Sequence, residues 1–253
     1  ESVAAELGFS DISANSMDAV SDRDVLLEFH SAAAVCMVHI SRLAEELVIW
    51  SSDEFGFVRL NEEYTTGSSI MPQKRNPDFA ELARGKTGRV YGDLIGLLTT
   101  LKGLPLTYNR DLQEDKEGFF DAADTLTTTL DVFQAMLPGM KLDEERVSGL
   151  AGESQMLATD LADYLVGKGM PFREAHGIMR ELSRQCDDSG VILRDLPLDE
   201  YQKLSDLFQK DVFEITAESS AAARDNPGGT APVRVAAALT EAKKILEAAG
   251  DGF

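Results

Sequence analysis

The chain has 253 residues, of which 24 are Lys or Arg and 44 are Asp or Glu, so its formal net charge at pH 7 is −20. This balance argues against a protein that binds nucleic acid or an anionic membrane surface, because such binding needs a basic footprint. The 43% of hydrophobic residues suffice for a real core in one large domain or two smaller ones. No apolar run approaches the ~18–20 residues of a membrane span.

The dominant period along the chain is helical. From residue 18 to 51 the apolar residues recur on one broad face, which predicts a long helix. Residues 52–77 are rich in Gly, Pro and polar residues, which is typical of a loop. A second long helix is expected from residue 78 to about 102, and a third from about 111 to 137, where a Pro-Gly pair ends it.

Shorter helices are expected in the remainder of the chain, where strand signals are almost absent. They are placed near residues 143–149, 153–167, 171–186, 197–209, 211–222 and 232–249. The pattern therefore predicts an all-α protein with two domains. Residues 1–142 form a long-helix bundle, and residues 143–253 form a small helical C-terminal domain.

A stripe of glycines marks the second long helix. Each glycine costs roughly 0.5–1 kcal/mol relative to Ala inside a helix. A tolerated cost of this size favours very close approach by another helix over local flexibility near a loop. Such a stripe fits a multi-helix core, including one that subunits share. The four residues are Gly85, Gly88, Gly92 and Gly96.

No metal or organic cofactor is indicated, because the chain has no CxxC, no HExxH and no Gly-rich phosphate loop after a strand. The two cysteines, Cys36 and Cys186, lie far apart within helical patterns. Free thiols in a reducing cytosol are therefore favoured over a disulfide, and a cytoplasmic location is expected.

Charge is unevenly distributed along the chain. Residues 67–89 contain five basic and two acidic residues, a local charge of +3, so the rest of the chain carries −23. A cationic region in a strongly anionic protein is typical of a site for an anionic substrate, and a solvated basic face is the alternative. The basic residues are Lys74, Arg75, Arg84, Lys86 and Arg89.

Several residues of this region could together perform proton chemistry beside a carboxylate. An electropositive setting could ionise the hydroxyl of Ser68 or Ser69 into a base. Lys74 could stabilise the charge that develops on a carboxylate when a neighbouring C–H is deprotonated, and Asn76 can orient that group. Glu81 could hold a histidine in one tautomer. Taken alone, these residue types are a weak indication of a catalytic site.

The loop GSSIMPQKRNP at residues 67–77 resembles the signature loop of the aspartase/fumarase lyase superfamily, whose members release fumarate. The flanking stretches look like the argininosuccinate lyase family. They are NSMDAVSDRD (15–24), WSSDEFGFVRL (50–60), NPDFAELARGKTGRVYG (76–92), TYNRDLQEDKEGFFD (107–121), LATDLADYLVGKGMPFREAH (157–176) and GGTAPVRV (228–235). Two alternatives stay open: an adenylosuccinate lyase, which Arg75 permits and residues 107–121 disfavour, and a non-catalytic, crystallin-like structural protein.

The resemblance implies a role for each matching residue. Ser68 would be the base of an anti β-elimination that splits argininosuccinate into arginine and fumarate. Lys74 and Asn76 would stabilise the aci-carboxylate intermediate, and Glu81 would pair with the active-site histidine of the family. The residues implied in substrate binding are Ser69, Tyr108, Gln113 and Lys116.

The resemblance also implies a cytoplasmic homotetramer of arginine biosynthesis or the urea cycle, with a core of long helices and active sites shared between subunits. Family members are nearly twice this length, and the N-terminal part, with its active-site histidine, is expected to be missing here. The histidines present do not replace it: His30 and His39 lie in the first long helix, and His176 matches a non-catalytic position. These 253 residues alone are expected to have little activity.

Overall fold

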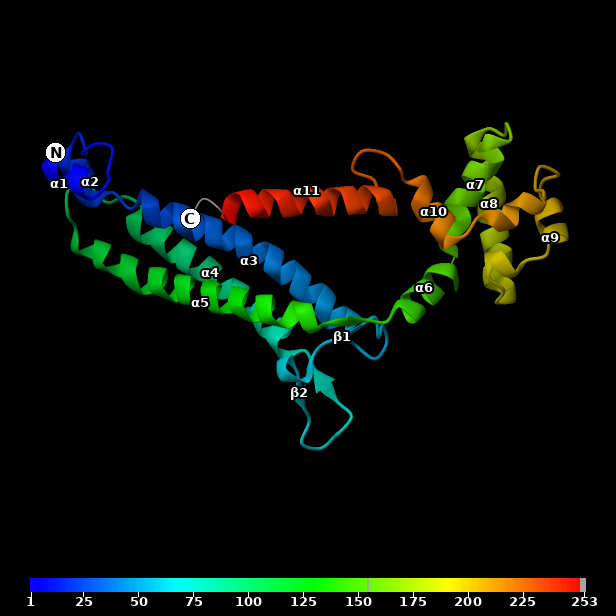
Figure 1. Ribbon diagram of the computed structural model, residues 1–253, viewed down its shortest axis with the longest axis horizontal. Helices are drawn as coiled ribbons and strands as arrows, with labels where there is room; N and C mark the ends of the chain where they lie inside the picture. Colours follow the sequence, from blue (N-terminus) through cyan, green and yellow to red (C-terminus); the bar gives the residue numbers. More distant parts are fainter. Residues whose placement is uncertain (154, 251–253) are drawn as a thin grey trace. The chain divides into compact units, whose positions relative to one another are not determined.

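The computed structural model describes residues 1–153 and 155–250, and it divides the chain into two compact units, residues 1–143 and 144–253. Helices make up most of the described residues, and the strands among them are two residues long, which confirms the all-α class (Figure 1). Within these ranges, no helix combines the length and the apolar character that crossing a membrane requires.

Three long helices build the first unit, as expected: α3 (Asp24–Trp50), α4 (Asp78–Leu101) and α5 (Asp115–Met136). Each packs against the other two, and the three run side by side in Figure 1. Two short helices, α1 (Ser2–Glu6) and α2 (Ser16–Ser21), precede them.

Two of the expected helix boundaries are wrong. The helix expected from residue 18 to 51 is interrupted, because Asp22 is extended and its Oδ1 accepts a hydrogen bond from the Asp24 amide at 2.8 Å. A carboxylate that binds nearby backbone in this way competes with a continuous helix. The helix expected from about residue 111 begins as a 3₁₀ turn, η2 (Arg110–Glu114), before α5.

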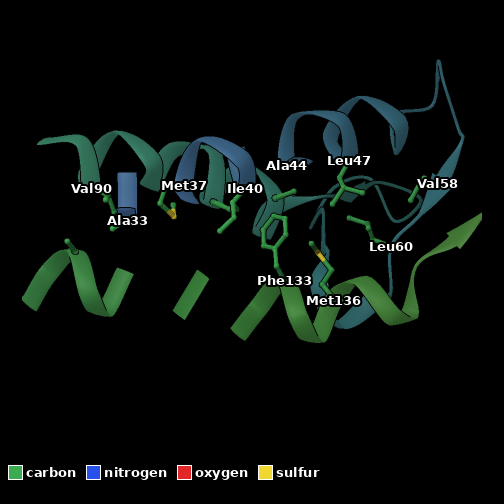
Figure 2. Packing of buried hydrophobic residues seen from close by; sticks show 13 residues of the cluster. Ala33, Met37, Ile40, Ala44, Leu47, Val58, Leu60, Val90, Phe133 and Met136 are labelled. Atoms are coloured by element: carbon green, nitrogen blue, oxygen red, sulfur yellow. The ribbon is translucent and has the colours of Figure 1, made fainter. Parts of the chain in front are cut away.

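The core of the first unit lies between the three helices. Buried α3 residues recur at spacings of four and three and so form one stripe; they are Ala33, Met37, Ile40, Ala44 and Leu47. Phe133 and Met136 of α5 pack against this stripe, and Val58 and Leu60 lie beside its end (Figure 2). Trp50, at the end of α3, also contacts the cluster.

Two short antiparallel ladders shape the loops at this end of the bundle. β1 (Val58–Arg59) pairs with β4 (Lys141–Leu142). β2 (Thr66–Gly67) pairs with β3 (Arg75–Asn76), so residues 68–74 form the tip of a hairpin that leads into α4. In Figure 1 this hairpin projects away from the three helices. Two 3₁₀ turns, η1 (Glu62–Tyr64) and η3 (Leu137–Gly139), accompany the ladders.

The second unit has its own core of short helices. Buried side chains of α7 (Ala158–Gly167) and α8 (Phe172–Ser189) pack with Tyr201 and Phe208, and the Tyr201 hydroxyl donates to the Leu193 carbonyl at 2.5 Å. Its elements are α6 (Glu144–Glu153), η4 (Gln155–Leu157), α7 (Ala158–Gly167), α8 (Phe172–Ser189), η5 (Leu193–Asp195), α9 (Leu198–Gln202), η6 (Lys210–Glu214), α10 (Ala217–Ala223) and α11 (Pro232–Gly250).

Three expected helices of this unit are wrong in extent. The helix expected over 197–209 ends at Gln202, whose side chain donates to the Phe208 carbonyl at 2.9 Å. The helix expected over 211–222 is divided into η6 and α10, because Thr216 and Ser219 form a capping box that starts a new helix. The helix expected from 153 begins at 158, and residue 154 lies outside the described residues.

Candidate functional site

The residues predicted to perform catalysis lie together at the N-terminal end of α4. Ser68 and Lys74 belong to the hairpin tip, Asn76 to β3, and Glu81 to the first turn of α4. Ser68 and Asn76 are half-buried, whereas Lys74 and Glu81 are exposed. Ser69, predicted to bind substrate, is exposed beside Ser68.

The hairpin tip holds the Ser68 hydroxyl in a specific turn. Its Oγ accepts hydrogen bonds from the backbone amides of Ile70 and Met71, at 3.2 and 3.1 Å, and the Lys74 amide donates to the Met71 carbonyl at 3.0 Å. Two N–H groups directed at one oxygen favour negative charge on it. The turn therefore fixes the position of the Ser68 hydroxyl and directs two backbone donors at its oxygen.

The other predicted binding residues lie around the N-terminal end of α5. The Gln113 side chain donates to the Tyr108 hydroxyl at 2.6 Å. The Lys116 Nζ donates to Asp115 Oδ1 at 2.8 Å. The backbone amide of Thr107, which precedes Tyr108, donates to the Met17 carbonyl at 3.1 Å and ties this segment to α2.

A buried carboxylate supports this second group. Asp115 is 5% exposed, and it also accepts a hydrogen bond from Arg23 Nε at 2.5 Å. Burial opposes ionisation of Asp115, but the hydrogen bonds from Lys116 and Arg23 outweigh it, so the pKa of Asp115 lies below its ordinary value. Sequence reasoning missed Arg23 and Asp115, since both lie in polar segments that carry no sign of burial.

One copy of the chain does not bring the two groups together. The hairpin precedes α4, and the Tyr108–Lys116 segment follows it. The 24 residues of α4 rise about 36 Å, because each helical residue adds about 1.5 Å. Residues at the two ends of α4 therefore cannot contact one small substrate molecule at the same time.

Three of the five basic residues of the cationic region pair with carboxylates outside it. Arg84 pairs with Glu45 of α3 at 2.5 Å, and Arg75 pairs with Glu62 at 3.0 Å. Arg89 pairs with Asp121 of α5, and these contacts raise the pKa of the guanidinium. Lys74 has no ion-pair partner within the ranges that the structure describes, so this ammonium group is available to an anionic ligand.

None of the described histidines is placed to interact with Glu81. His30 is fully buried against Phe29 and Phe119, and neither ring nitrogen has a hydrogen-bond partner. Burial lowers the pKa of His30. His39 is exposed, and His176 belongs to the second unit. Among the described residues, no histidine is hydrogen-bonded to Glu81.

The glycine stripe of α4 faces open space. A Cβ built on any of the four glycines would meet nothing within 4 Å in this chain. The close helix approach that the stripe predicts is therefore not made by the described residues of the same copy. Large apolar side chains are exposed on the same three helices; they include Val25, Leu82, Ile95, Leu98 and Phe120.

Comparisons with known proteins extend over nearly the whole chain. Residues 1–92 match the family model described as lyase, and residues 155–222 match the model described as argininosuccinate lyase C-terminal. The argininosuccinate lyase of Dehalococcoides mccartyi strain BAV1 is 56% identical over 99% of this chain, and that of Symbiobacterium thermophilum is 56% identical over 97%. In both cases this chain covers 54% of the relative, so it spans about half the length of the curated relatives it matches.

Solved structures have the same fold. A variant of EDDS lyase with bound fumarate matches with a TM-score of 0.79 and 27% identity, over 96% of this chain and 50% of that chain. The 3-carboxy-cis,cis-muconate lactonizing enzyme from Pseudomonas putida matches with a TM-score of 0.73 and 19% identity, over 96% of this chain and 52% of that chain.

Proposed function

The chain belongs to the argininosuccinate lyase family, and we propose that an enzyme of the relatives' length containing this sequence cleaves argininosuccinate to arginine and fumarate. The observation that carries the proposal is the 56% identity to argininosuccinate lyases over 99% of the chain. The hairpin at the start of α4 supports it, because Ser68, Lys74 and Asn76 lie there in a setting suited to a carboxylate substrate.

The proposed reaction is an anti β-elimination. Ser68, ionised with the help of the Ile70 and Met71 amides, takes the proton from the carbon β to the leaving nitrogen. The C–H electrons move into the adjacent carboxylate, and Lys74 and Asn76 stabilise the aci-carboxylate so formed. Its collapse forms the double bond of fumarate and breaks the C–N bond, and a general acid donates a proton to the guanidino nitrogen of the departing arginine.

We propose that Glu81 orients a histidine of another segment, because none of the histidines that the structure describes is hydrogen-bonded to it. Tyr108, Gln113 and Lys116 bind the substrate beside the hairpin of a different copy, with Ser69 next to the base. The length of α4 supports this division, since about 36 Å separates its ends. The assembly proposed is a homotetramer whose sites are shared between subunits.

Two further features support this assembly and its location. The open glycine stripe and the exposed apolar residues of α3, α4 and α5 are suited to helix packing between copies. Cys36 and Cys186 are free thiols, which fits a reducing cytoplasm.

The test is the absorbance of fumarate released by a protein of the relatives' length, with argininosuccinate or adenylosuccinate supplied separately. Release from argininosuccinate alone is expected. Release from adenylosuccinate alone, or tetramer assembly without turnover of either compound, would contradict the proposal. The 253-residue chain is expected to release little fumarate, and a rate near that of the longer protein would refute the need for a histidine from elsewhere.

A further inference from the structure

The hairpin that presents Ser68 has a very short neck. Its ladder consists of two pairs, Thr66 with Asn76 and Gly67 with Arg75. An isolated two-stranded hairpin is marginally stable at best in water, and two pairs are fewer than a usual hairpin has. The position of Ser68 relative to α4 therefore depends on side chains that tie the neck to its surroundings.

Two side-chain interactions connect this neck, the β2–β3 ladder, to neighbouring residues. Arg75 pairs with Glu62 at 3.0 Å, but their side chains are 50% and 82% exposed, so water and salt weaken the pair. Thr66 Oγ1 donates a hydrogen bond to Asp78 Oδ2. Asp78 is half-buried in the first turn of α4, where the helix dipole favours a carboxylate, and a hydrogen bond to an ionised group is a strong one. Thr66 is itself exposed, so the Thr66–Asp78 bond is the stronger of the two interactions because one of its partners, Asp78, is shielded.

This bond joins the two ends of the segment that carries Ser68, Lys74 and Asn76. Thr66 is two residues before Ser68, and Asp78 is two residues after Asn76 and one turn before Glu81. When this hydrogen bond forms, it holds β2, which leads to Ser68, against the N-terminal end of α4, beside which Asn76 and Glu81 lie. Tyr108, Gln113 and Lys116 belong to a separate segment and are untouched by it.

We propose that Thr66 and Asp78 are positioning residues of the elimination, an inference that rests on the proposed function. Their hydrogen bond holds the hairpin neck closed, so that Ser68 meets the substrate proton in the right geometry. The bond acts on the reacting groups through the backbone, and neither side chain needs to touch the substrate. Its loss lowers kcat, whereas KM, set largely by the separate binding segment, changes little.

The experiment compares matched variants of the full-length enzyme. Thr66→Val removes the donor at nearly constant shape, and a misplacement of the base by about 1 Å lowers kcat by up to about 100-fold. Thr66→Ser keeps the donor and is expected to restore most of the rate. Glu62→Gln weakens the exposed tie and serves as the control, with kcat unchanged. A double variant, Thr66→Val with Asp78→Ala, is expected to lose no more than the worse single variant, because both remove one interaction.

A second measurement does not need turnover. Lys74 and Arg75 are trypsin sites in the exposed hairpin, so the rate of cleavage after them reports how firmly the neck is closed. Thr66→Val is expected to speed this cleavage several-fold with an unchanged thermal midpoint, and Thr66→Ser is not. Wild-type kcat and cleavage rate in Thr66→Val, or an equal loss in Thr66→Ser, would overturn the inference. If the unaltered enzyme releases no fumarate, the proposed function fails, while the cleavage rates still decide whether the tie exists.

Discussion

Two inactive variants of the full-length enzyme, Ser68→Ala and Lys116→Ala, are expected to regain activity when they assemble together. Ser68 lies in the hairpin before α4, and Lys116 lies in the segment after it, about 36 Å away along the helix. If each site combines a hairpin and a binding segment from different copies, a mixed assembly contains sites in which both parts are intact.

The size of the recovery follows from counting. In a random one-to-one mixture, half of the hairpins and half of the binding segments are intact, so about a quarter of the sites have both. About a quarter of the wild-type rate is therefore expected after the variants are co-expressed or refolded together, measured as fumarate absorbance per amount of enzyme. A site formed within one copy would give no recovery, because every copy lacks one part.

The matched control mixes Ser68→Ala with Lys74→Ala. Both positions belong to the same hairpin, so no hairpin in the mixture is intact and the rate should stay at that of the variants alone. Subunit exchange is verified by native mass spectrometry. Mixed assemblies of Ser68→Ala and Lys116→Ala that show no recovery would refute the division of the site along α4.

Three further outcomes are expected. Ser68→Ala should lower kcat by about 10²–10⁴-fold with little change in calorimetric substrate affinity; an equal loss of affinity would contradict its role as the base. Leu47→Ala, at a fully buried position, should lower the free energy of unfolding of the first unit by about 2–5 kcal/mol, and Trp50, the single tryptophan, reports this through its fluorescence. His30→Leu should reduce the loss of stability in acid. Burial lowers the pKa of His30, so the unfolded chain takes up its proton first, and stability falls as the pH drops through the ordinary value of 6.5. Urea unfolding at pH 5 and pH 8 would refute this if both proteins lost equal stability.

The long helices could be predicted from the sequence, because their apolar residues recur over many turns. The ends of these helices could be predicted less well, because each end depends on which backbone group one side chain hydrogen-bonds. Asp22 could have continued the helix, but its side chain instead accepts a hydrogen bond from the backbone amide of Asp24. The Gln202 side chain likewise donates to the carbonyl of Phe208, six residues further along the chain, and α9 ends at Gln202. Periodicity carries no information about such choices.

The candidate site divides in the same way. The loop that carries Ser68 could be predicted from its motif, but the short ladder that makes it a hairpin could not. The distance from Ser68 to Lys116 follows from the length of the helix between them. The neutralised cations could not be predicted, because their partners lie on other helices. Arg84 meets Glu45, 39 residues earlier in the chain, and only the packing of α3 on α4 places the two side by side. Net charge along a segment therefore overstates the field at a site.

The exposed apolar surface of α3, α4 and α5 links the assembly of copies to the formation of the proposed site. Val25 is 73% exposed and Phe120 is 61% exposed, and the glycine stripe of α4 faces open space. Exposed apolar residues on packed helices make an isolated copy prone to association. The helix α4 also separates the two halves of the proposed site. Packing of a second copy on these exposed faces would therefore place the hairpin of one copy beside the binding segment of another. Assembly and site formation are then a single event, so a substitution at Gly88, far from Ser68 in contacts, should reduce activity and assembly together.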